Sequence, residues 1–285
     1  MATEHWVHND GLRLRVVEAG SPADPCVLFV HGWPDSADLW RNQIPVFADR
    51  GYRVLAIDQR GYGESEIPDA VEDFHVFKAV GDLLALLDHF SVNAAHIVGH
   101  DWGAAVSWLF ATFHPDRTRT LVALSVGHPN AFRRAGIEQL RQSFYMMLFQ
   151  FPDIAEEWLS ADDFLNFRTM VDNSPENTRH VMNLSRPGRL TASLNWYRAN
   201  MGPRWLIDPE PDLPPVSVPT LGVIGSDDPV LGIPQMEMSR QFVSAQFEAV
   251  VLNDQSHWLP SDSADQLTPI LLGWIATQTA AAAKK

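Results

Sequence analysis

Cysteine and long apolar runs are scarce in this chain of 285 residues. Cys26 is the only cysteine, so a disulfide within the chain and a cysteine-rich metal cluster are both excluded. It stands in the apolar run Cys26–Val30, where we expect a buried, unreactive thiol. No stretch reaches the ~18 apolar residues that a membrane span needs, and the N-terminus has no basic segment followed by an apolar one. We therefore expect a cytoplasmic protein that does not bind membranes.

Positive charge is also scarce. The chain has 21 Lys and Arg against 35 Asp and Glu, which gives a formal net charge of −14 at pH 7. Such a surface repels polyanions, so nucleic acid and anionic membranes are disfavoured as partners. The composition, 46% hydrophobic and 20% charged, is that of a globular protein long enough to bury a sizeable core.

Short strand-like runs alternate with longer amphipathic segments, which is typical of an α/β fold with a mostly parallel central sheet flanked by helices. One predicted helix spans residues 74–90 and has an apolar stripe of Phe77, Val80, Leu84 and Leu87. Residues 104–111 are apolar nearly all round and predict a buried helix. Strands are predicted at residues 12–19, 27–30, 53–57, 96–98, 121–125, 221–224 and 247–252.

The alternation stops after the strand at residues 121–125, between about His128 and Leu213. Helical patterns occur there without a convincing strand, at residues 138–149, 154–159 and 191–201. The chain returns through a proline-dense stretch at residues 208–215, which predicts an extended connector. A helical insertion between two strands is the arrangement of a lid over an active site. We expect a hydrolase-like core of residues 1–127 and 214–285, with a helical cap formed by residues 128–213.

Asp101 is the most informative residue of the chain. It stands in Gly99-His100-Asp101-Trp102-Gly103, between a strand and a helix, which is the context of a nucleophile elbow with aspartate in place of serine. An N-capping aspartate would not need glycine two residues away on both sides. A carboxylate that attacks a saturated carbon leaves an ester that water can cleave, whereas a serine would leave a stable ether. The exchange therefore predicts epoxide opening or halide removal.

The oxyanion hole is expected from two backbone N–H groups. The loop after the strand at residues 27–30 reads His31-Gly32-Trp33-Pro34, and in this layout it lies beside the elbow. We expect the N–H groups of Trp33 and Trp102 to hold the oxyanion that forms when water attacks the Asp101 ester.

The acid and the base must follow the nucleophile in that order. His257 is the only one of eleven histidines on a loop after the last predicted strand, and we expect it to activate the hydrolytic water. Asp227 or Asp228 would orient it, and we favour Asp228 because Asp227 could equally cap the turn. The glycine-rich loop at residues 58–65 lacks a P-loop lysine and its spacing, so Asp58 and Arg60 within it are expected to tie loops together.

With these motifs in place, residues 12–274 resemble α/β-hydrolase-fold proteins of the epoxide hydrolase and haloalkane dehalogenase branch. Both families have an aspartate nucleophile that is often followed by tryptophan, as in Asp101-Trp102. The resemblance implies a small-molecule substrate and water as partners, with no cofactor and no metal. The oligomeric state, monomer or homodimer, is left open.

The insertion separates the two families. An opening epoxide needs a donor with an acidic proton, and epoxide hydrolases use two lid tyrosines. The chain has four tyrosines, and residues 144–150 and 194–198, which hold Tyr145 and Tyr197, resemble the segments that carry them. The resemblance implies that Tyr145 and Tyr197 grip the epoxide oxygen, and that the product is a vicinal diol.

A haloalkane dehalogenase is the alternative. A leaving halide needs indole or amide N–H donors, and many dehalogenases carry asparagine where this chain has Trp33. Others carry a lid tryptophan, for which Trp158, Trp196 and Trp205 are candidates. Fluoroacetate dehalogenases have arginine at the position of Trp102, which argues against an anionic substrate here. A non-catalytic receptor of the same fold is disfavoured by the complete acid–base set.

Overall fold

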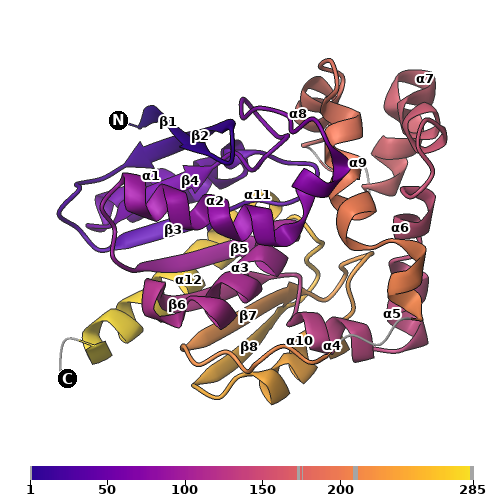
Figure 1. The fold of residues 1–285 in the computed structure, drawn as a ribbon. Coiled ribbons are helices and arrows are strands. Elements are labelled where there is room, and N and C mark those ends of the chain that lie inside the picture. The colour runs from indigo at the N-terminus through magenta and orange to yellow at the C-terminus, as the bar shows by residue number, and fades with distance from the viewer. Residues whose placement is uncertain (1, 172–173, 175, 208–210, 283–285) are drawn as a thin grey trace.

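A computed structural model describes residues 2–171, 174, 176–207 and 211–282. Within them, eight strands form one sheet in the order β1-β2-β4-β3-β5-β6-β7-β8 (Figure 1). The pairs β1–β2 and β2–β4 are antiparallel and the other pairs are parallel, so the predicted mostly parallel sheet is confirmed. The strands are β1 (Thr3–Asn9), β2 (Leu12–Ala19), β3 (Cys26–Val30), β4 (Arg53–Ile57), β5 (Ala95–His100), β6 (Thr118–Leu124), β7 (Thr220–Gly225) and β8 (Phe247–Leu252).

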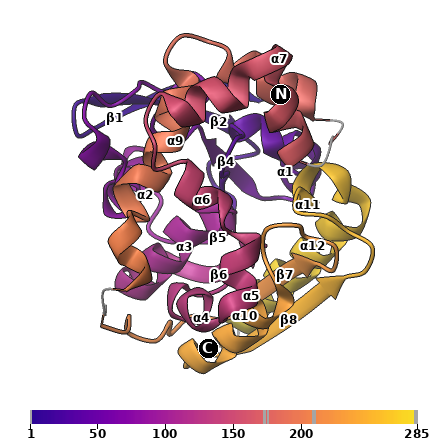
Figure 2. The same ribbon diagram turned by 90° about the vertical axis from the view of Figure 1, so that its right-hand side faces the viewer.

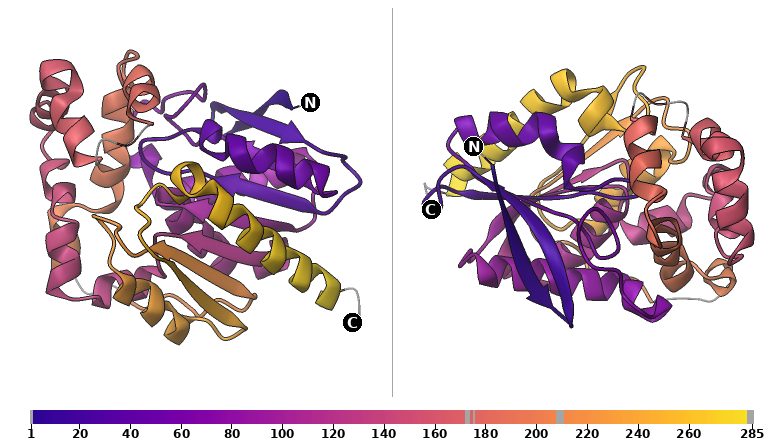
Figure 3. Two further views of the ribbon diagram at one scale, coloured as in Figure 1. Left: turned by 180° about the vertical axis from the view of Figure 1, so that it is seen from behind. Right: turned by 90° about the horizontal axis from the view of Figure 1, so that it is seen from above.

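Helices cover both faces of the sheet (Figure 3). Side chains alternate along a strand, so in β3 Leu28 and Val30 pack with α2 (Val76–His89) and α3 (Trp102–Phe113). Val27 and Phe29 pack on the opposite face, with α1 (Gln43–Asp49) and α12 (Ala264–Ala282). A strand buried on both faces must be apolar throughout, as this one is. The remaining core helices are α10 (Ile233–Met238), α11 (Leu259–Asp262) and the 3₁₀ helices η1 (Ala37–Asn42), η2 (Val71–Phe74), η3 (Pro115–Arg117) and η5 (Ser239–Phe242).

The predicted helix forms as α2, but its apolar stripe is only partly buried. Phe77 belongs to the predicted apolar stripe, yet it is 49% exposed. Val80 and Leu87 of the stripe are buried as predicted, and Ala79, Leu83 and Leu86 are buried with them, because packing against the sheet and α3 selects the face. The Phe77 ring packs against that of Phe113 in a tilted arrangement, with 5.6 Å between the ring centroids. The prediction for α3 is confirmed, since its residues 102–104 and 106–111 are all buried.

Between β6 and β7, the described residues form helices and no strand. We call residues 129–206 the helical insertion, which Figure 2 shows facing the viewer. Of the predicted connector, residues 208–210 lie outside the described residues, and residues 211–215 form neither helix nor strand. The helices of the insertion are α4 (Pro129–Arg134), α5 (Ile137–Gln142), α6 (Tyr145–Leu148), α7 (Ile154–Met170), α8 (Asn177–Leu184), α9 (Arg189–Asn200) and the 3₁₀ helix η4 (Pro203–Leu206).

Two predicted structural roles are confirmed. Asp58 accepts hydrogen bonds from the backbone N–H groups of Ala37 and Glu64 at 2.7 and 2.9 Å, and so joins two loops. Arg60 is fully buried and forms an ion pair with Asp82 at 2.8 Å. Cys26 is buried as expected, and burial raises the pKa of its thiol to about 12. None of the helices described here has the length and apolar character to span a bilayer.

Candidate active site

Asp101 stands in a strained turn between β5 and α3, with φ of 52°. An L-residue rarely adopts this conformation, and it persists where the surrounding structure enforces it. The flanking glycines make the turn possible: a Cβ on Gly99 would overlap the carbonyl oxygen of Gly103, and a Cβ on Gly103 would overlap that of Val30. The elbow therefore requires both glycines of the motif.

The Asp101 carboxylate is held from two sides. Its Oδ1 atom accepts a hydrogen bond of 2.7 Å from the backbone N–H of Trp33, as the loop after β3 predicts. Its Oδ2 atom lies 3.7 Å from Nε2 of His257. A Cβ on Gly32 would overlap Oδ1 and lie 2.6 Å from the backbone nitrogen of Trp102, so glycine lets the loop and the elbow approach. Both N–H groups expected in the oxyanion hole thus lie beside the carboxylate.

His257 and Asp228 come together from the loops after β8 and β7. Nδ1 of His257 donates to Oδ2 of Asp228 at 2.8 Å, and both side chains are buried. Oδ1 of Asp228 accepts from the backbone N–H groups of Val230 and Leu231 at 3.0 and 2.9 Å. Asp227 instead accepts a hydrogen bond from Ser226 Oγ. The structure therefore brings Asp228, and not Asp227, against His257.

The charges around His257 favour its protonated form. Burial would lower the pKa of His257, but the carboxylates of Asp228 and Asp101 outweigh burial and raise it to about 10. His100, which the sequence did not single out, lies against His257 at 4.7 Å between ring centroids. It donates from Nε2 to the carbonyl oxygen of His257 at 2.9 Å. Burial lowers the pKa of His100 to about 4, so this ring is neutral.

Two tyrosines of the helical insertion face the elbow. Tyr145 begins α6 and Tyr197 lies in α9, with ring centroids 6.0 Å apart. The Trp102 ring lies edge-on to that of Tyr197, with 5.2 Å between the ring centroids. Burial raises the pKa of both phenols, and the charge of Asp101 raises it further. Both phenols are therefore protonated and can donate.

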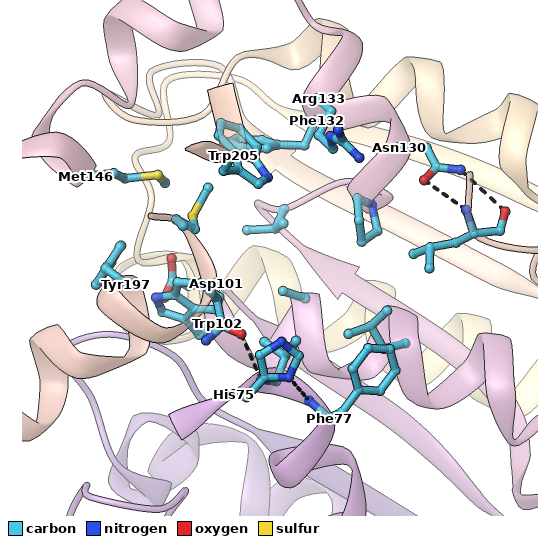
Figure 4. A pocket seen from close by; sticks show the side chains of 18 of the residues that line it. His75, Phe77, Asp101, Trp102, Asn130, Phe132, Arg133, Met146, Tyr197 and Trp205 are labelled. Atoms are coloured by element: carbon cyan, nitrogen blue, oxygen red, sulfur yellow. Dashed lines mark hydrogen bonds between the residues drawn. The ribbon is translucent and has the colours of Figure 1, made fainter. Parts of the chain in front are cut away.

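Two cavities meet at Asp101, Tyr145 and Tyr197. The larger has a volume of about 310 Å³ and is bordered mostly by apolar side chains. Figure 4 shows Asp101, Trp102 and Tyr197 on one side of it, and Phe132 and Trp205 across from them. The smaller has a volume of about 20 Å³, and Val230 and His257 border it as well. A water needs roughly 10–15 Å³ measured in this way, so the smaller cavity has room for one.

The indole N–H groups considered for halide binding do not gather at the elbow. The indole of Trp33 donates to Ser193 Oγ at 3.2 Å, and that of Trp196 donates to the carbonyl oxygen of Arg60 at 3.2 Å. Trp158 is 41% exposed, while Trp205 borders the larger cavity. Among the residues that the structure describes, no cluster of three or more His, Cys, Asp or Glu side chains suits a metal ion.

Comparison with known proteins agrees with this geometry. Residues 25–264 match a family described as alpha/beta hydrolase fold. The chain is 34% identical to Epoxide hydrolase A of Mycobacterium tuberculosis, over 96% of this chain and 97% of that protein. The chain belongs to the α/β-hydrolase-fold epoxide hydrolases. The expectation drawn from the Asp101 elbow and the tyrosine pair is therefore confirmed at the level of the family.

Two further relatives support this assignment. The epoxide hydrolase is 32% identical to Epoxide hydrolase 3 of Xenopus tropicalis, over 92% of this chain and 74% of that protein. It superposes on the crystal structure of Epoxide Hydrolase A from Mycobacterium thermoresistibile with a TM-score of 0.83. That pair shares 29% sequence identity, and the match covers 97% of this chain and 98% of the other.

Sequence reasoning missed several residues of this epoxide hydrolase site. The N–H groups of Val230 and Leu231 that hold Asp228 had a local signal, since an aspartate in a turn accepts hydrogen bonds from residues shortly after it. The cavity residues Phe132 and Met146 had none, because their positions depend on how the insertion packs on the core. His100 had none because its contact with His257 depends on where the loop after β8 lies.

Proposed function

We propose that this protein converts an apolar epoxide to a vicinal diol through an ester on Asp101, with residues 128–213 acting as a cap. The observation that carries the proposal is the position of Asp101 between two spaces. A substrate in the larger cavity would lie beside the phenols of Tyr145 and Tyr197. A water molecule in the smaller cavity would lie beside His257. Cytoplasmic location and a monomeric or homodimeric state are also proposed.

In the first step, Oδ2 of Asp101 attacks one ring carbon, because Oδ1 is held by the N–H of Trp33. The ring C–O bond breaks, and the developing alkoxide takes a proton from Tyr145 or Tyr197. The products are an aspartyl ester, a hydroxyl group and a tyrosinate. Esterification removes the charge of Asp101, which lowers the pKa of His257. The proton released from His257 restores the phenol.

In the second step, neutral His257 takes a proton from water in the smaller cavity, and the hydroxide attacks the ester carbonyl. Asp228 stabilises the resulting imidazolium through the hydrogen bond of 2.8 Å. The N–H groups of Trp33 and Trp102 receive the oxyanion. Its collapse expels the diol, which takes its second proton from His257, and the restored Asp101 carboxyl returns a proton to His257. The sum is epoxide plus water giving diol.

The larger cavity also supports a choice of substrate class. Its volume of about 310 Å³ and its mostly apolar border favour an uncharged epoxide with an aryl or alkyl arm. The aromatic rings of Phe132 and Trp205, 5.7 Å apart, face such an arm. Parallel assays with styrene oxide, an aliphatic epoxide and a bromoalkane test this choice, because diol and bromide are distinct products.

Two single replacements test the two-step scheme. Asp101→Asn is expected to abolish diol formation, since a neutral amide is a poor nucleophile. His257→Gln is expected to accumulate the ester, seen by intact-protein mass spectrometry as an added mass equal to that of the epoxide. Turnover by His257→Gln at the wild-type rate would contradict the scheme.

A further inference from the structure

A buried amide joins the helical insertion to the turn that follows Asp228. Nε2 of Gln139, in α5, donates to the carbonyl oxygen of Val230 at 2.9 Å, and its Oε1 accepts from the N–H of Gly232 at 2.9 Å. One side chain thus pairs with both backbone groups that flank residue 231, as a neighbouring strand would. Gln139 is 4% exposed, so its amide is shielded from water, while Val230 and Gly232 are partly exposed.

A second side chain completes the contact. Nε2 of Gln139 also donates to Oγ of Ser143 at 2.8 Å, and that hydroxyl donates to the carbonyl oxygen of Val230 at 3.2 Å. We call the hydrogen bonds of Gln139 and Ser143 with residues 230–232 the Gln139 clamp. Every hydrogen-bonding group of the Gln139 side chain is used in it.

The turn at residues 230–232, which the Gln139 clamp contacts, also positions Asp228. The N–H groups of Val230 and Leu231 donate to Oδ1 of Asp228, and the next N–H along the chain, that of Gly232, donates to Gln139. Of three consecutive backbone N–H groups, two therefore donate to Asp228 and the third donates to Gln139. Val230 also borders the smaller cavity beside His257.

The other end of the clamp leads to Tyr145. Ser143 stands two residues before this tyrosine, and its backbone links α5 to α6: its N–H donates to the carbonyl oxygen of Gln139 at 2.9 Å, and its carbonyl accepts from Met146 at 3.1 Å. The Gln139 clamp therefore contacts the backbone that positions Tyr145, a proton donor in the first step. It also contacts the turn that positions Asp228, the acid of the second step.

From this arrangement we propose that Gln139 is a positioning residue, which sets the place of Tyr145 relative to the Asp228–His257 pair. The inference rests on the proposed function. Replacing Gln139 with leucine would leave the partly buried N–H of Gly232 without its acceptor, and such a group relaxes toward another partner. Misplacement of a catalytic group by about 1 Å can cost up to 100-fold in rate. We therefore expect Gln139→Leu to slow both steps.

The test compares Gln139→Leu with Gln142→Leu, an exposed glutamine on the same helix. Single-turnover reactions followed by rapid quenching and mass spectrometry give the rates of ester formation and ester hydrolysis separately. Because only active molecules form ester, these rates do not depend on the folded fraction. Gln139→Leu should slow each step by about tenfold or more, while Gln142→Leu should match the wild type.

The pH profile supplies a readout that a loss of folded protein would not move. A looser contact between Asp228 and His257 lowers the pKa of His257, so the pH limb of ester hydrolysis should move to lower pH in Gln139→Leu. Above the pKa of the new carboxyl group, Gln139→Glu keeps an acceptor for the N–H of Gly232 but cannot donate to the carbonyl of Val230. It should therefore also be slow.

Rates and a pH limb for Gln139→Leu equal to those of Gln142→Leu would overturn the proposal. If Gln139→Leu does not fold, Ser143→Ala removes one hydroxyl of the same clamp and is judged by the same outcomes. Failure of the proposed function is a separate result: His257→Gln would then accumulate no ester. If the ester accumulates in His257→Gln while Gln139→Leu behaves as Gln142→Leu does, the clamp alone is refuted.

Discussion

The Asp101→Asn variant should lower the pKa of His257, and the size of the fall follows from the structure. Nε2 of His257 lies 3.7 Å from Oδ2 of Asp101. At that distance Coulomb's law with an effective dielectric constant of about 20 gives ~4 kcal/mol, which corresponds to about 3 in pKa. The pKa of His257, about 10 in the presence of both carboxylates, should therefore fall to near neutrality.

This fall imitates the effect of the ester, which also removes the charge of Asp101. It explains how an imidazolium of the resting enzyme becomes a base after alkylation. The assay is a titration of the His257 imidazole nitrogens by NMR in the wild type and in Asp101→Asn. Asp227→Asn serves as the control, because Asp227 is exposed and its carboxylate contacts Ser226 instead.

Stability should follow the same linkage. A pKa raised in the folded state adds stability that is fully present below the unfolded pKa of about 6.5 and is lost as pH rises toward about 10. The free energy of unfolding of the wild type should therefore fall by a few kcal/mol across that window, and that of Asp101→Asn by less. An unchanged pKa of His257 in Asp101→Asn would refute the electrostatic account.

Three further predictions concern individual side chains. Tyr145→Phe and Tyr197→Phe should each slow ester formation by about 10²-fold or more, with little effect on hydrolysis of the ester, as rapid-quench kinetics would resolve. Asp228→Asn should slow ester hydrolysis by about 10⁴-fold and leave ester formation nearly intact, so that ester accumulates during turnover; fast hydrolysis would count against the acid assignment. Asp82→Ala should lower the free energy of unfolding by ~3–5 kcal/mol in urea titrations, because it leaves the guanidinium of Arg60 buried without its carboxylate. A smaller loss there would mean that Arg60 finds another partner or reaches water.

The sheet and the order of its functional loops could be predicted from the sequence because they depend on local patterns. Apolar runs such as Val27–Val30 mark strands buried on both faces, and Gly99 and Gly103 mark a turn that other residues cannot form. The strand β1 was missed because Val7 is its only buried residue, so its sequence has no strong apolar alternation.

The parts that could not be predicted depend on contacts between distant segments. Nothing local distinguishes Phe77, which borders the larger cavity, from the buried apolar residues of the same helix. Gln139 reads as an ordinary polar residue of a surface helix, and its pairing with Val230 and Gly232 appears only when the insertion meets the core. The choice between Asp227 and Asp228 likewise depended on which carboxylate faces His257.

The central claim, that Asp101 becomes esterified and is released by water, is tested most directly with isotopic oxygen. Enzyme in excess over epoxide is allowed one turnover in water enriched in heavy oxygen, and the product and the peptide containing Asp101 are analysed by mass spectrometry. The account predicts that the heavy atom enters the Asp101 carboxyl group and that the first diol formed carries none. Heavy oxygen in the diol with an unlabelled Asp101 would contradict it.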